Sequence, residues 1–103
     1  MQEKVTRASA DYYTNSLKSN YRSLLDEYEK YSASVEYYAQ QAVPEANLII
    51  EQATRSYRAG ALDYLEYVIT LTKAFDIKQN YLNTLNSYNQ TIINIDYITG
   101  KIY

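Results

Sequence analysis

The sequence lacks cysteine, histidine and tryptophan altogether, and it contains one proline and only two glycines. Without cysteine the chain can form no disulfide, no thiol nucleophile and no thiolate zinc site. Without histidine it also lacks every catalytic triad that depends on an imidazole base. We therefore expect no enzymatic activity, no metal site and no cofactor.

Charge and hydropathy narrow the class further. The 103 residues include 10 Lys and Arg against 12 Asp and Glu, a net charge of -2. Nucleic-acid binders normally gather a basic excess on one face, so we do not expect that function. The sequence has no apolar run long enough to cross a bilayer as a helix. Its length fits one small domain or a piece of a larger protein.

The first half of the chain carries a heptad repeat. Apolar and aromatic residues alternate at intervals of four and three, which is the pattern of a helix that lies along other helices. Many of these residues are tyrosines, of which the chain has 14. Tyrosine suits half-buried sites, so we interpret them as packing residues. The repeat consists of Leu17, Tyr21, Leu24, Tyr28, Tyr31, Val35, Tyr38 and Ala42.

Pro44 interrupts this first pattern. It removes a backbone donor and crowds the carbonyl of Gln40. The apolar pattern nevertheless continues from Ala46 to Tyr57. The sequence permits a kinked continuous helix, or two helices with Pro44 in the first turn of the second. We favour the kink, because no cluster of Gly, Asn or Ser precedes the proline as a stop signal.

A second helical pattern runs from Leu62 to about Ile98. Its apolar face is wide, which predicts burial against more than one neighbouring helix. Gly100 follows the last periodic residue and is a signal for the end of the helix. The central stripe of this face is Val68, Leu71, Phe75, Leu82, Leu85 and Ile92, and Ala74, Tyr81, Tyr88 and Ile95 widen it.

A short turn joins the two patterns. Gly60 is the natural residue for a positive φ at the end of the first helix, and Asp63 can cap the start of the second. Short helix connections imply antiparallel neighbours. We therefore predict an all-α fold, a long antiparallel helical hairpin, with helices at about 3–57 and 62–98, a turn at 58–61, and the tip at 58–62.

Residues around the turn resemble a known family motif. Ala53, Tyr57, Gly60, Leu65 and Glu66 match the hairpin tip of the TolC-like outer-membrane efflux protein family. The returning helix of that family is similar to the run Tyr81-Leu82-Asn83-Thr84-Leu85-Asn86-Ser87-Tyr88-Asn89. The end of the family's second repeat resembles Ile98-Thr99-Gly100. The context of Pro44 and the Tyr64-Leu65-Glu66-Tyr67 variant resemble the heavy-metal efflux branch, the CusC- and CzcC-like channels.

This resemblance implies a place in a larger assembly. Family members are homotrimers with an outer-membrane β-barrel that continues into a periplasmic helical tunnel. The present chain would be the C-terminal periplasmic hairpin of such a channel. Its tip would dock a periplasmic adaptor protein, which works with an inner-membrane resistance-nodulation-division (RND) transporter. The expected docking and aperture residues are Tyr57, Arg58, Ala59, Gly60, Ala61, Leu62, Asp63 and Tyr64.

One departure and two alternatives accompany this interpretation. Some family members carry a basic or polar residue where this chain has Leu62, so the contact that closes their aperture is not expected here. The chain could instead be a free-standing helical-hairpin interaction module, or the coiled-coil hairpin of an adaptor, although no lipoyl-like β segment is predicted. Asp63 and Glu66 lack the pocket and third group of a catalytic acid pair.

Overall fold

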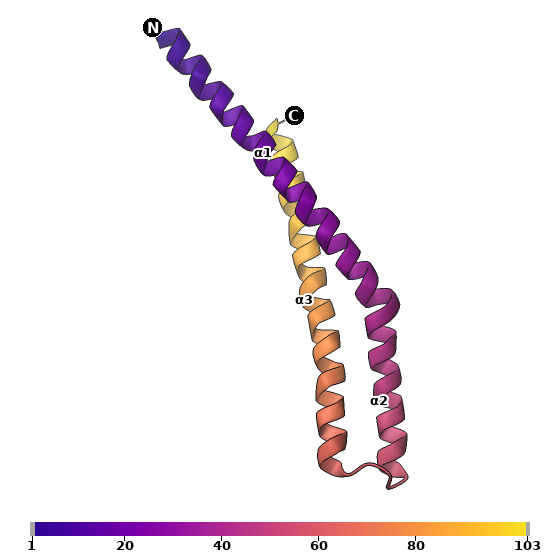
Figure 1. Cartoon of the computed structure of the whole chain (residues 1–103). Coiled ribbons are helices and arrows are strands. Elements are labelled where there is room, and N and C mark those ends of the chain that lie inside the picture. The colour runs from indigo at the N-terminus through magenta and orange to yellow at the C-terminus, as the bar shows by residue number, and fades with distance from the viewer. Residues whose placement is uncertain (1, 103) are drawn as a thin grey trace.

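The protein is an elongated helical hairpin (Figure 1). The computed structural model describes the backbone of residues 2–102 and the side chains of residues 9–100. It measures 83 × 22 × 15 Å along its principal axes. The helical segments are α1 (Gln2–Tyr37), the π-helical turn η1 (Tyr38–Ala42), α2 (Val43–Arg58) and α3 (Tyr64–Ile102).

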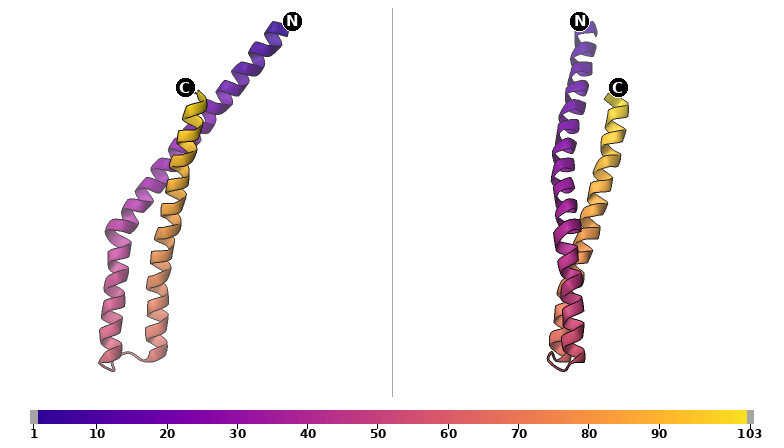
Figure 2. Two further views of the ribbon diagram at one scale, coloured as in Figure 1. Left: turned by 180° about the vertical axis from the view of Figure 1, so that it is seen from behind. Right: turned by 90° about the vertical axis from the view of Figure 1, so that its right-hand side faces the viewer.

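The first three segments form one path, and α3 returns antiparallel to it. α2 and α3 run side by side from the closed end, and α1 crosses α3 higher up (Figure 2). Both chain ends therefore lie at the open end, where α1 extends past the end of α3 (Figure 1). The predicted all-α antiparallel hairpin is confirmed.

The helical path bends close to Pro44. The chain stays helical there, but the backbone N–H of Val43 donates to the carbonyl of Tyr38, one residue further back than in an α-helix. Pro44 lies in the first turn of α2, where its missing N–H is tolerated. The structure thus combines features of both alternatives: an unbroken helical path that changes direction, and a proline at the start of a new α-helical segment.

Tyrosine rings meet across the contact of α1 and η1 with α3. The rings of Tyr28 and Tyr88 stack with their centroids 5.4 Å apart, and Tyr38 meets Tyr81 edge-on at 6.2 Å. The hydroxyls of Tyr28 and Tyr88 form a long hydrogen bond of 3.4 Å. The predicted heptad residues from Leu17 to Tyr38 are all half-buried. Their periodicity therefore identified the side of α1 that faces α3.

Alanines dominate the contact between α2 and α3. Ala46 and Ala74 are almost fully buried, with 0% and 1% of their surface exposed, and Ala42 and Ala53 are each 7% exposed. Such small side chains allow two helix backbones to approach closely. Among the described residues no large side chain is fully buried. Stability is therefore spread along the two helices rather than concentrated in one core.

The wide apolar face of α3 divides into two parts. Ala74 is buried, and Leu71, Tyr81, Leu85 and Tyr88 are half-buried. By contrast, Val68, Phe75 and Leu82 remain 37%, 54% and 55% exposed. One hairpin partner covers only one side of a helix, so the outer part of the predicted face has no cover within the described chain.

The bounds of α3 differ from the prediction at both ends. The helix begins at Tyr64 rather than Leu62, because the connection from α2 extends to Asp63. It also continues through Gly100 to Ile102, so the expected stop at Gly100 is wrong. Only Gly60 has a positive φ among the described residues. A helical glycine costs only about 1 kcal/mol relative to alanine, which a long helix can absorb.

Candidate functional site

The predicted tip residues lie together at the closed end of the hairpin. Tyr57 and Arg58 end α2, Tyr64 begins α3, and the residues between them form the connection (Figure 1). Leu62 is half-buried, whereas the other predicted tip residues are exposed. The sequence prediction therefore located a contiguous, solvent-facing end of the molecule.

The end of α2 forms a Schellman motif around Gly60. The N–H of Ala61 donates to the carbonyl of Ser56 at 2.9 Å, and the N–H of Gly60 donates to that of Tyr57 at 3.1 Å. Gly60 has a φ of 79°, as the sequence predicted. These bonds satisfy helix-end carbonyls that would otherwise have no partner. The turn is therefore compact and has a defined backbone.

Asp63 caps the start of α3. Its Oδ1 accepts a hydrogen bond of 2.8 Å from the backbone N–H of Glu66. Its own carbonyl accepts the N–H of Tyr67 at 3.0 Å, which is the first bond of the helix. A carboxylate here also complements the positive end of the helix dipole. The predicted capping role of Asp63 is confirmed.

Tyr57 joins the two helices just above the turn. Its ring stacks on that of Tyr67 with a centroid distance of 4.6 Å and an interplanar angle of 7°. Tyr64 lies on another side of Tyr57 at 6.3 Å. The Tyr67 hydroxyl is 2.9 Å from Oγ1 of Thr54, across the hairpin. Aromatic and polar contacts together hold the first turn of α3 against the last turn of α2.

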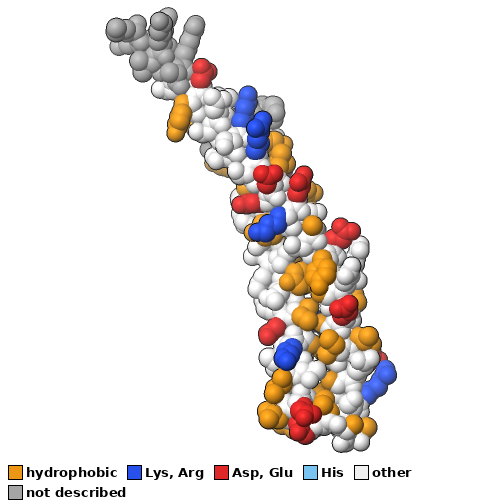
Figure 3. All heavy atoms as spheres, viewed as in Figure 1, with side chains coloured by type: hydrophobic (Ala, Val, Ile, Leu, Met, Phe, Trp, Pro, Cys, Tyr) orange, Lys and Arg blue, Asp and Glu red, His pale blue; other side chains and the backbone are white. Residues whose placement is uncertain are grey.

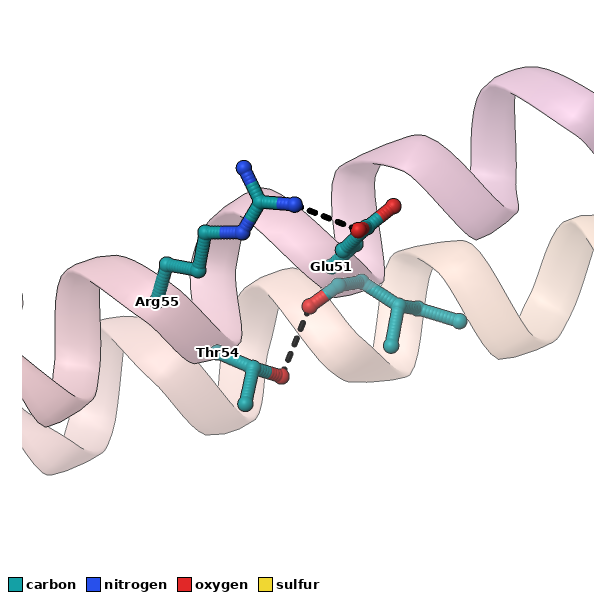
Figure 4. A network of polar contacts seen from close by, with 4 residues as sticks. Glu51, Thr54 and Arg55 are labelled. Carbon is teal, nitrogen blue, oxygen red and sulfur yellow. Dashed lines mark hydrogen bonds and ion pairs between the residues drawn. The ribbon is translucent and has the colours of Figure 1, made fainter.

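A polar network on α2 supports this arrangement (Figure 4). Oγ1 of Thr54 donates to the carbonyl of Ile50 at 2.7 Å. On the exposed side of the helix, Arg55 pairs with Glu51 one turn earlier. An exposed pair of this kind contributes little stability. Arg58, at the end of α2, has no ion-pair partner among residues 9–100.

The first two turns of α3 expose four large apolar side chains. Tyr64 and Leu65 are 68% and 67% exposed, and Ile69 and Val68 are 47% and 37% exposed. In Figure 3 hydrophobic side chains gather at the closed end next to acidic ones. An exposed cluster of this kind is typical of a surface that contacts another molecule.

Two residues of the tip were missed by the sequence analysis, Thr54 and Tyr67. The sequence places Tyr67 in the family motif but predicts no packing role for it. A signal did exist, because Tyr57 and Tyr67 lie at equal sequence distances on either side of Leu62. Residues placed in this way lie at similar heights on the two arms of an antiparallel hairpin.

Neither a metal-binding cluster nor a membrane-spanning helix occurs among the described residues. They contain no cluster of three or more acidic side chains that could hold a metal ion. No helix among them is both long enough and apolar enough to cross a membrane. The tip combines a capped turn, stacked rings and exposed apolar side chains.

Comparison with known proteins gives no assignment. No protein-family model, no curated protein and no solved structure matches the chain. The hairpin fold therefore stands on the structure alone.

Proposed function

We propose that this chain is the periplasmic tip hairpin of a TolC-like outer-membrane efflux channel, of the heavy-metal branch. In this role it would bind proteins and catalyse no reaction. Its tip would dock a periplasmic adaptor, which links the channel to an RND transporter in the inner membrane. The channel would be a homotrimer whose helical tunnel contains three copies of this hairpin.

The observation that carries this proposal is the construction of the tip. The Schellman turn at Gly60 and the cap at Asp63 give a compact backbone at the end of an 83 Å long molecule. Directly beside it, Tyr64 and Leu65 project apolar surface into solvent. A narrow end with a hydrogen-bonded turn and exposed apolar side chains suits end-on contact with the tip of another helical hairpin.

The outer face of α3 supports the trimeric part of the proposal. Val68, Phe75 and Leu82 recur every seven residues and stay exposed. In a helical tunnel each hairpin has neighbours on both sides, and these would cover such a stripe. The same stripe would also suit the alternative, a free-standing hairpin module that binds other helices.

The test compares two substitutions at Gly60 in the full-length channel. Gly60→Asn keeps a residue that tolerates positive φ, whereas Gly60→Arg adds bulk and charge at the tip. A Cβ at this position meets no atom within 4 Å, so the first side-chain carbon of either residue has room, and the internal cost of a substitution is the strain of the positive φ. We expect Gly60→Arg to abolish export while the channel stays folded and abundant, and Gly60→Asn to retain most export.

A cross-linking experiment identifies the partner. A photoreactive amino acid at Tyr64 should give a covalent product with the adaptor, and one at Glu29, on α1 far from the tip, should not. Normal export by Gly60→Arg at normal abundance would refute the docking role. A product at Tyr64 with a different helical protein would favour the free-standing module.

A further inference from the structure

The heptad register changes by one residue at the bend of the hairpin. Above the bend, the seam positions run through Val35 and Tyr38 to Ala42. Continued at the same intervals, the repeat would place Glu45 and Gln52 on the seam. Both of these side chains are exposed in the structure.

The buried positions below the bend lie one residue later. Ala46, which follows Glu45, is 0% exposed, and Ala53, which follows Gln52, is 7% exposed. The same shift applies to the neighbouring isoleucines, since Ile50 is half-buried while Ile49 is 39% exposed. The sequence therefore contains one residue more than an unbroken heptad repeat would need between the two seams.

The π-helical turn η1 lies where this extra residue must be accommodated. In η1 the Val43 N–H reaches back five residues to the Tyr38 carbonyl, instead of four as in an α-helix. One more residue is thus wound into the turn. In a regular α-helix that residue would rotate everything beyond it by about 100°. The wider turn absorbs the rotation, and the seam residues on both sides of η1 face α3.

Pro44 stabilises the turn at this place. It has no N–H to donate to the carbonyl of Gln40, so an ordinary α-helix cannot complete its hydrogen bonds here. Proline and π-helical turns are also recognised causes of sharp helix bends. Pro44, which prevents regular α-helical bonding, therefore lies two residues after the end of η1.

We infer that η1 is a register-correcting joint, fixed by Pro44, which lets two differently packed arms share α3. The upper arm contacts α3 through tyrosines such as Tyr28, and the lower arm through alanines such as Ala46. Large and small side chains hold helices at different separations, so a bend is required where the arms meet. This inference is independent of the proposed function.

The test compares two variants, each of which lacks one residue at a different place in the chain. Both variants carry Pro44→Ala, so that a regular helix can form. In the first, Gln40 is deleted inside η1, which places Val43 four and Ala46 seven residues after Tyr38. Val43 then takes the seam position of Ala42, and the heptad intervals continue unbroken. In the matched control, exposed Glu29 is deleted from α1, which turns Tyr28 and the residues before it away from the seam.

Two measurements distinguish the outcomes. We expect the Gln40 deletion to leave the melting temperature within about 4 °C of Pro44→Ala alone, and the Glu29 deletion to lower it by about 8 °C or more. The chain has no cysteine, so spin labels at Asp26→Cys and Asn89→Cys report the spacing of α1 and α3. Their distance should be kept in the Gln40 deletion and changed in the control.

An additional insertion provides the opposite change. One alanine added after Gln40 should increase the register offset between the two seams from one residue to two. This variant should have a lower melting temperature and an altered distance between the labels. Equal destabilisation by the Gln40 and Glu29 deletions would overturn the inference. So would an altered label distance in the Gln40 deletion, or an alanine insertion without effect.

Discussion

Tyr57 and Tyr67, from opposite arms of the hairpin, stack almost parallel with their ring centres 4.6 Å apart. The contact lies directly above the turn, where neither arm has a large buried side chain. We predict that Tyr57→Ala and Tyr67→Ala are coupled by about 0.5–1.5 kcal/mol in the free energy of unfolding. A double-mutant cycle by chemical denaturation measures this coupling, and additive effects would show that the rings do not interact.

The hydroxyl of Tyr67 allows a separate prediction. Tyr67→Phe keeps the stacked ring but removes the hydrogen bond to Thr54. We expect a loss of about 1 kcal/mol in the free energy of unfolding. Thr54→Val in the Tyr67→Phe background should then cost less than it does in the wild type. Equal costs in both backgrounds would contradict the bond.

The two glycines should respond in opposite directions to alanine. Gly60 has a φ of 79°, and Gly100 lies in helix α3, yet a Cβ meets nothing within 4 Å at either place. The comparison therefore isolates backbone conformation. Gly60→Ala should cost about 1–2 kcal/mol, and Gly100→Ala should stabilise by up to about 1 kcal/mol. Thermal unfolding measures both effects, and a destabilising Gly100→Ala would contradict the helical assignment there.

Asp63 should matter more to stability than the exposed carboxylates inside α3. Its side chain accepts the Glu66 N–H at the start of the helix. Asp63→Ala should therefore cost about 1 kcal/mol. Asp76→Ala is the matched control, since Asp76 is exposed in the helix interior and alanine is the better helix former. Similar losses for both variants would mean that Asp63 does not act as a cap.

The hairpin should lose stability at alkaline pH through Tyr28. The pKa of Tyr28 is raised above its ordinary value near 10. The largest cause is the hydrogen bond with Tyr88, followed by the charge of an ionised Tyr88 and by burial. The folded state thus holds this proton more tightly than the unfolded state. The stability that protonated Tyr28 contributes to the folded state is fully present below pH 10. It is lost as the pH rises through the raised pKa of Tyr28.

Substitution of Tyr28 tests this dependence. Tyr28→Phe should make the decline of stability above pH 10 shallower. Tyr12→Phe removes a tyrosine that is 76% exposed and serves as the control, with the wild-type profile expected. Denaturation at a series of pH values measures both. Identical alkaline profiles for the two variants would contradict the prediction.

The outer stripe of α3 should cause self-association. Val68, Phe75 and Leu82 are exposed at regular spacing, and contiguous apolar patches usually find partners. We expect concentration-dependent association by sedimentation, which Phe75→Glu weakens. Gln79→Glu adds the same charge to an exposed polar position of α3 and should have a smaller effect. A monodisperse monomer at high concentration would refute the prediction.

Much of the hairpin was determined by local rules that the sequence displays. The heptad residues from Leu17 to Ala42 identified the seam of α1 and η1, because a helix presents every third or fourth residue on one side. Gly60 and Asp63 identified the turn, because positive φ and helix capping depend on the residue itself and its immediate neighbours.

Only the tertiary structure decided which apolar residues are covered, where α3 ends and how the first helical path bends. Which part of the wide face of α3 is covered follows from the width of its one partner, so Phe75 and Leu82 are exposed although their periodicity matched that of buried residues. Gly100 continues the helix, since a stop signal is weak unless the chain must turn there. The π-helical turn arose because α1 and α2 must both face α3, a requirement that Pro44 permits but does not reveal by itself.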